Sequence, residues 1–289
     1  MAYEDASLAQ GNVITVNRES LRLRLERFPW WFLVILLVTA VTALIITTKS
    51  TYTEAFGFIR AGLSVTIMTT ISAYFIALIV GIVTGLGRIS RNVVFKNLAT
   101  FYVEVVRGIP MLVLIFFIAL VLVPAVTSSL NALGERLSAV GLGGLGAFFS
   151  SVTNKGVPMQ LRAVIALSVT YGAFSAEIFR AGIQSIHKGQ MEAARSQGMT
   201  YGQAMRYIIL PQAIRNVLPA LGNDFISMLK DSSLVSVLAV RDITQVAKLY
   251  AGQTFRYPEA YLTLAVLYLS MTMLLSLGVK ALEKRFQSS

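Results

Sequence analysis

The sequence has 289 residues, of which 55% are hydrophobic and only 13% are charged, and its mean hydropathy is +0.69. A soluble domain is usually about 25% charged, so this composition indicates an integral membrane protein. The formal net charge of +11 does not predict nucleic-acid binding, because the basic residues flank long apolar blocks, as in loops that face the cytoplasm and anionic lipid.

The N-terminal leader, residues 1–29, is polar and contains four Arg residues. An apolar stretch follows over 30–48, which begins with Trp30 and Trp31 and has no clear small-residue cleavage site after it. Tryptophan is enriched where a helix enters the membrane interface. We therefore expect 1–29 to be a cytoplasmic leader and 30–48 to be a retained transmembrane helix rather than a signal peptide.

Five further apolar segments follow along the chain, at 62–86, 101–126, 161–179, 217–240 and 260–279. Each is close to the ~20 residues that an α-helix needs to cross a bilayer. The sequence therefore predicts an all-α integral membrane protein with about six transmembrane helices. Fifteen of the 25 Lys and Arg residues fall on the side that carries both termini, which predicts that both termini are cytoplasmic.

The connection at 127–160 contains four closely spaced glycines, Gly141, Gly143, Gly144 and Gly146, among apolar residues. We expect it to form an interfacial helix or a loop packed on the bundle; a docking element is the alternative.

The cytoplasmic loop at 183–216 has strong local signals for two short helices. Residues 190–197 are good helix formers, and Gly198 after them predicts a left-handed helix stop. Thr200 and Gln203 match a capping box that would open a second helix. Pro211 either interrupts that second helix or starts the next one.

Seven residues of this loop form a spaced motif: Glu192, Ala193, Ala194, Gly198, Ile208, Leu210 and Pro211. The motif resembles the EAA loop of ABC importer permeases at every position. Three more segments, 102–110, 175–182 and 221–234, resemble polar amino-acid permeases of the histidine/glutamine/arginine branch. The resemblance covers about 60–283, so 60–283 is expected to be the permease domain, with the coupling loop at 183–216 and a cytoplasmic tail at 284–289.

The resemblance implies a MetI-like bundle in a bacterial inner membrane that imports polar amino acids. It also implies ABC ATPase subunits that bind ATP and Mg, a second permease copy that is identical or homologous, and an extracytoplasmic solute-binding protein. The coupling helix would dock in a cleft of the ATPase. The chain itself has no G-x-x-x-x-G-K-[ST] loop, no Cys and only one His, His187, so we expect no cofactor, no metal site and no enzymatic activity in it.

An ion-gradient-driven secondary transporter is the alternative function. It would account for the spans and for charges within them, but not for the EAA loop.

Charged residues within a span cost on the order of 3 kcal/mol each, so each needs a reason. Glu104 and Arg107 are three apart on a predicted helix and could form a structural ion pair. Glu177 and Arg180 have the same spacing, and we expect them to anchor the start of the coupling loop.

Lys230 and Asp231 are expected near the middle of the membrane, because Lys230 lies about 18 Å along a helix that starts near Leu218. Ser232 and Ser233 follow, which resembles an interrupted helix beside a transport path. A structural or gating role is the alternative. The residues that we assign to a substrate path are Glu104, Arg107, Asp224, Lys230, Asp231, Ser232 and Ser233.

Overall fold

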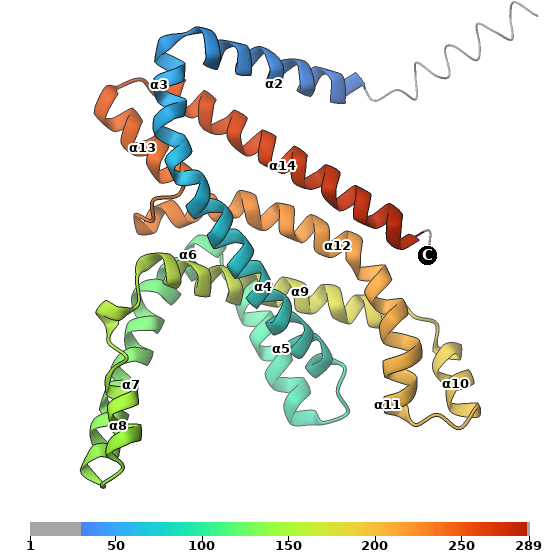
Figure 1. Cartoon of the computed structure of the whole chain (residues 1–289). Helices are drawn as coiled ribbons and strands as arrows, with labels where there is room; N and C mark the ends of the chain where they lie inside the picture. Colours follow the sequence, from blue (N-terminus) through green and yellow to red (C-terminus); the bar gives the residue numbers. More distant parts are fainter. Residues whose placement is uncertain (1–29, 288–289) are drawn as a thin grey trace, which may run out of the picture. The chain divides into compact units, whose positions relative to one another are not determined.

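A computed structural model describes residues 30–287 of the chain (Figure 1), so the predicted leader at 1–29 lies outside the described residues. The described residues contain helices and no β-strand, which confirms the predicted all-α class. The chain divides into two compact units, Met1–Ser50 and Thr51–Ser289. The described part of the first unit is α2 (Trp30–Thr48), an apolar helix of 19 residues.

The second unit carries the other helices. In chain order these are α3 (Ser50–Ile59), α4 (Leu63–Arg88), α5 (Val93–Gly108), α6 (Met111–Phe117), α7 (Val123–Ala139), α8 (Gly143–Ser150), α9 (Met159–Gln184), α10 (Lys188–Ser196), α11 (Tyr201–Ala204), α12 (Leu210–Asp231), α13 (Ile243–Thr254) and α14 (Tyr257–Gln287). Short 3-10 or π turns join several of them without a break.

Four helical stretches among the described residues are long and apolar enough to cross a membrane: Ser50–Arg88, Met111–Ala139, Met159–Gln184 and Tyr257–Arg285. A shorter apolar helix covers Leu33–Thr48. The predicted membrane character is therefore confirmed, although two of the predicted spans have a different form.

The predicted span at 101–126 is divided between two helices. Ile109 is extended, with φ −104° and ψ 134°, because it precedes Pro110. α5 therefore ends at Gly108, and a new helix begins at Met111. The predicted span at 217–240 is also interrupted: the α-helical part of α12 ends at Asp231, and a 3-10 turn continues over Ser232–Leu238.

The connection at 127–160 is largely helical rather than a loop on the bundle. α7 continues to Ala139, and α8 then returns antiparallel to it. A positive φ of 88° at Gly141 makes the turn between them. In Figure 1 this hairpin leads away from α4 and α9.

The centre of the second unit is α9, which contacts α4, α5, α6 and α12. α4 lies directly against its backbone, because a Cβ atom at Gly81 would be 2.6 Å from Cβ of Ser175 and one at Gly85 would be 2.9 Å from the carbonyl oxygen of Ala176. Small residues at such positions let two membrane helices approach closely and gain van der Waals contact.

We predict that Gly81→Ala destabilises the protein, since the added methyl group must push α4 away from α9. Overpacking of this kind costs about 1–3 kcal/mol. The matched control is Gly278→Ala in α14, where a Cβ meets nothing within 4 Å. Thermal unfolding in detergent would measure both variants, and equal midpoints would contradict the close contact.

Candidate functional site

The predicted coupling loop begins with α10, and both ends of this helix are closed by specific hydrogen bonds. At the start, Nδ1 of His187 accepts from the N–H of Gly189 at 3.1 Å. At the end, Gly198 has φ 84°, and the N–H of Met199 donates to the carbonyl of Ala194 at 3.2 Å. This is the Schellman arrangement, which favours glycine at the left-handed position. The predicted helix stop at Gly198 is confirmed.

The second half of the loop opens with the capping box. The N–H of Thr200 donates to Oε1 of Gln203 at 2.8 Å, and the N–H of Gln203 donates to Oγ1 of Thr200 at 3.3 Å. From there the chain stays helical through a π turn, Met205–Ile209, into α12. Pro211 follows this π turn directly. The helix neither ends nor begins at Pro211: the N–H of Leu210 donates to the carbonyl of Met205, five residues back, and this local change of register accommodates the proline.

The motif residues divide between two faces. Ala194 is buried, and α10 packs against α11 and the π turn. Glu192, Ala193 and Gly198 are exposed. Ile208 and Leu210 are half-buried and Pro211 is exposed. One face of the loop thus holds the two short helices together, and the other presents a carboxylate and small residues to solvent.

A cluster of four charged side chains, which we call the ion cluster, joins three helices: Arg88 of α4, Glu104 of α5, and Glu177 and Arg180 of α9. The guanidinium of Arg88 is 2.7 Å from the carboxylate of Glu177 and 3.2 Å from that of Glu104. Arg180 also pairs with Glu177. The predicted Glu177–Arg180 pair is confirmed.

The suggested Glu104–Arg107 pair does not form. Glu104 binds Arg88 instead, and the guanidinium of Arg107 lies over the ring of Phe174, 5.7 Å from its centroid. Arg88 was not among the predicted site residues. No local signal reveals it, because Arg88 meets its partners only when α4 packs on α9.

The ion cluster lies near the end of α9 from which the coupling loop departs. The two ends of that loop are also joined, because Nδ2 of Asn216 donates to Oγ of Ser185 at 3.1 Å. Gly182 allows α12 to come close, since a Cβ there would collide with Cγ1 of Val217. The coupling loop is therefore attached to the bundle by packing and by polar contacts.

Two further carboxylates are held between α9 and α12. Asp231 accepts from the hydroxyl of Tyr171 at 2.7 Å, and Asp224 accepts from Oγ of Ser175 at 3.0 Å. Tyr171 and Ser175 are one turn apart on α9, so both contacts lie on the same helix-to-helix seam. Neither donor was among the predicted site residues, although their spacing in an apolar helix is a signal that could have found them.

The remaining predicted path residues have different surroundings. Lys230 is exposed and forms no ion pair within the part of the chain that the structure describes. Ser232 is buried and donates to the carbonyl of Leu229 at 2.7 Å, whereas Ser233 is half-buried. The structure therefore groups Asp224, Lys230 and the serines along α12 and its 3-10 extension, while Glu104 belongs to the ion cluster.

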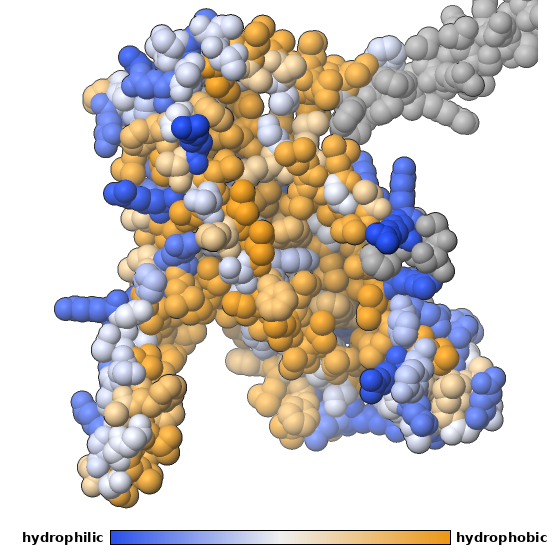
Figure 2. All heavy atoms as spheres, in the orientation of Figure 1, coloured by the Kyte–Doolittle hydropathy of each residue, from blue (hydrophilic) through white to orange (hydrophobic). Residues whose placement is uncertain are grey.

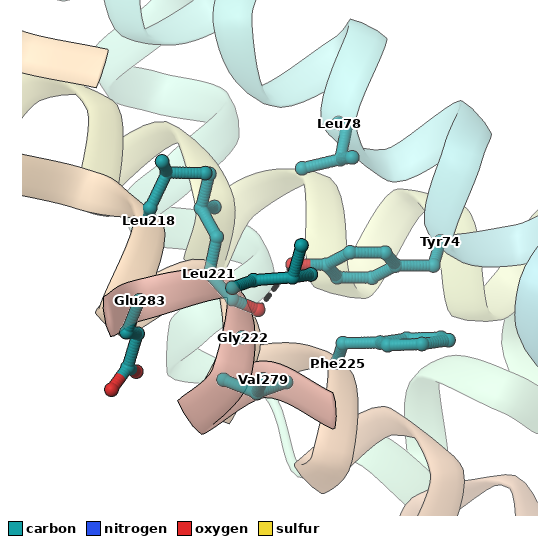
Figure 3. A pocket seen from close by; sticks show the side chains of 9 residues that line it. Tyr74, Leu78, Leu218, Leu221, Gly222, Phe225, Val279 and Glu283 are labelled. Atoms are coloured by element: carbon teal, nitrogen blue, oxygen red, sulfur yellow. Dashed lines mark hydrogen bonds between the residues drawn. The ribbon is translucent and has the colours of Figure 1, made fainter. Parts of the chain in front are cut away.

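A pocket of about 230 Å³ lies between α4, α12 and α14 (Figure 3). Its walls are almost entirely apolar, and the ring of Tyr74 is stacked on Phe225 while its hydroxyl donates to the carbonyl of Leu221 at 2.5 Å. The one carboxylate at its rim, that of Glu283, points away from the Tyr74 ring. None of the predicted path residues lines this pocket, and its apolar walls do not suit a zwitterionic ligand.

Among residues 30–287, no group of three His, Cys, Asp or Glu side chains is arranged to hold a metal ion.

Residues 77–288 match the family described as "Binding-protein-dependent transport system inner membrane component". The chain is 37% identical to a probable glutamine ABC transporter permease protein, GlnM of Bacillus subtilis, over 82% of this chain and 96% of that protein. It is 33% identical to the arginine transport system permease protein ArtQ of the same organism, over 80% and 94% of the two chains.

One solved structure, a crystal structure of an amino acid ABC transporter with histidines, matches with a TM-score of 0.64 at 38% sequence identity. The match covers 81% of this chain and 95% of the other. The arrangement of helices in the second unit is thus that of a solved transporter chain.

We predict that Arg88→Gln weakens the contact of α4 and α5 with α9, because it removes the charge from both ion pairs while Glu177 keeps Arg180. Hydrogen bonds to charged groups contribute about 1.5–3 kcal/mol, so the unfolding midpoint should fall. Lys96→Gln on the exposed surface of α5 is the control. A double-mutant cycle with Glu177→Gln would detect the coupling; strictly additive effects would argue against the pair.

Proposed function

Because the chain belongs to the family of binding-protein-dependent transport system inner membrane components, we propose that it is the membrane-spanning permease subunit of an ABC importer for polar amino acids. The observation that carries this proposal is the coupling loop: a short helix closed at both ends, attached to the central helix α9, with Glu192 and Ala193 facing outward. The substrate class is supported by relatives named for glutamine and arginine transport.

In the proposed mechanism, separate ATPase subunits bind ATP and Mg, and this chain hydrolyses nothing. α10 docks in a cleft of the ATPase through its exposed face. Closure of the ATPase pair then moves α10 as a rigid unit, since its ends are fixed by His187 and Gly198. The motion passes to α9 directly along the chain and to α4 and α5 through the ion cluster. Such coupling requires rigid elements with two arrangements.

The proposed substrate path runs beside α12 and its 3-10 extension, past Asp224, Lys230, Asp231, Ser232 and Ser233. Lys230 supports it most directly, because an exposed ammonium group at mid-membrane requires a polar or water-filled surrounding. A second permease copy, identical or homologous, would enclose that surrounding. We assign Glu104 and Arg107 to the cytoplasmic end of this path, where Glu104 acts through the ion cluster.

We further propose that the permease domain covers 60–283, that α2 is an additional transmembrane helix, and that the leader and the tail at 284–289 are cytoplasmic. The membrane would be the bacterial plasma membrane, and an extracytoplasmic solute-binding protein would deliver the amino acid. An ion-gradient-driven transporter is not supported, because it leaves the coupling loop without a role.

The test is uptake into proteoliposomes that contain this chain, its ATPase and its permease partner. Uptake of labelled amino acid should require ATP and the solute-binding protein, and it should persist when ion gradients are collapsed. Uptake that follows an ion gradient without ATP would refute the proposal. Glutamine, arginine and histidine would be compared as substrates.

We predict that Gly198→Val uncouples transport without preventing membrane insertion. The left-handed φ at Gly198 costs a β-branched residue roughly 1 kcal/mol or more, and that strain would redirect α10. Gly202→Val is the matched control, because Gly202 lies four residues away within α11, without a positive φ, and both sites have open space for a side chain.

Pull-down of the ATPase and ATP-driven uptake would be measured for both variants at equal membrane levels. Normal pull-down and full uptake with Gly198→Val would show that 192–211 is not the transmission loop.

A further inference from the structure

The helical hairpin formed by α7 and α8, residues 123–150, is a compact unit in which two backbones touch. A Cβ at Gly146 would be 2.8 Å from the carbonyl oxygen of Gly134, and one at Gly134 would be 2.6 Å from the backbone nitrogen of Ser150. Because the two helices meet through small residues, their large side chains must point elsewhere.

The large apolar side chains of the hairpin gather on one side. On α7 they recur every three or four residues, which places them on one helical face. The residues concerned are Val126, Leu130, Leu133, Leu137 and Val140 on and just after α7, with Leu145 and Phe148 on α8. Leu133 is 44% exposed and Phe148 is 65% exposed.

The other side of α7 is polar. Ser128 and Glu135 share a face almost opposite to Leu133, whereas Arg136 borders the apolar face, three residues after Leu133 and four before Val140. A long basic side chain at such a border can extend its charge toward the headgroups. Figure 2 shows the hairpin as hydrophobic along one edge and pale or hydrophilic along the other. The hairpin is therefore amphipathic as a whole.

The base of the hairpin is held by a buried arginine. Arg162, near the start of α9, is 6% exposed and donates to the carbonyl oxygens of Ala119 at 2.9 Å, Val157 at 3.0 Å and Asn154 at 2.7 Å. Ala119 lies in a π turn, Ile118–Leu122, between α6 and α7. The chain entering the hairpin and the chain leaving it are thus tied to one guanidinium group.

The helical stretch that contains α7 is too long to remain in the hydrocarbon. Met111–Ala139 has 29 residues, which is about 43 Å at the α-helical rise, against a hydrocarbon core of ~30 Å. In Figure 1, α7 and α8 run across the direction of α9 and α12, at the end of α9 opposite to the coupling loop. Exposed apolar side chains also precede the hairpin, at Phe117, Val121 and Leu122, and Leu122 is one turn before Val126.

We propose that the α7–α8 hairpin lies on the membrane surface opposite to the coupling loop, with the Leu133 and Phe148 face in the boundary between lipid headgroups and acyl chains. The segregated faces, the crosswise direction and the continuity with the span surface are those of an interfacial amphipathic element. The occupant of the apolar face is lipid rather than protein. This inference requires no particular substrate or ATPase partner.

The test uses the absence of cysteine in the chain, which gives each single-Cys variant one labelling site. Leu133→Cys, Phe148→Cys and the control Ser128→Cys would carry a nitroxide spin label in full-length protein in proteoliposomes. Collision with oxygen, which concentrates in lipid, would be compared with collision with a water-soluble nickel chelate. At 133 and 148 oxygen should dominate, and at 128 the preference should reverse.

Nickel-dominated collision at 133 and 148 would overturn the proposal, because the hairpin would then extend into water. Protection of 133 and 148 from both reagents would also overturn it. In that case, dipolar coupling between the labels would show that a second copy of this chain covers the apolar face. Loss of the protection when the solute-binding protein is removed would show that the solute-binding protein covers it.

Discussion

The close approach of α4 to α9 sets the distances between the polar groups around α9. Gly81 and Gly85 bring α4 onto the backbone of α9 at Ser175 and Ala176. At this separation the guanidinium of Arg88 is 2.7 Å from the carboxylate of Glu177. The other sides of α9 contact α5, α6 and α12. α9 is therefore surrounded by four helices, and its polar side chains face several of them.

Burial in an apolar bundle makes each of those polar groups expensive unless it has a partner. Tyr171 and Ser175 therefore donate to Asp231 and Asp224, and Glu177 lies between two guanidinium groups. These contacts restrict how α12 can slide along α9. Lys230 is the exception, because its charge faces outward from the same helix that holds the two aspartates. The transport path that we propose beside α12 would therefore have a wall fixed by these contacts and one exposed charge.

The elements at the two ends of α9 are stabilised in different ways. At one end, the coupling loop keeps its shape by local means, since the His187 cap, the Gly198 stop and the Thr200 capping box all close within a few residues. At the other end, the α7–α8 hairpin depends on a distant residue, because Arg162 holds backbone carbonyls on both sides of it. The loop can therefore keep its shape without contacts from the rest of the bundle, whereas the base of the hairpin is fixed by a residue of another helix.

Features that depend on neighbouring residues and on composition could be predicted from the sequence. The helix stop at Gly198, the capping box, the Glu177–Arg180 pair and the interruption after Asp231 are all short-range, and long apolar segments need a membrane. The extended conformation of Ile109 before Pro110 is equally local, but the apolar residues on both sides of it led us to predict one continuous span over 101–126. Three other features could not be predicted in this way: Glu104 binds Arg88 rather than Arg107, Tyr171 donates to Asp231, and the hairpin runs across the direction of α9. Those outcomes depend on how closely α4, α5, α9 and α12 approach, and side-chain spacing within one helix carries no information about the distance to another.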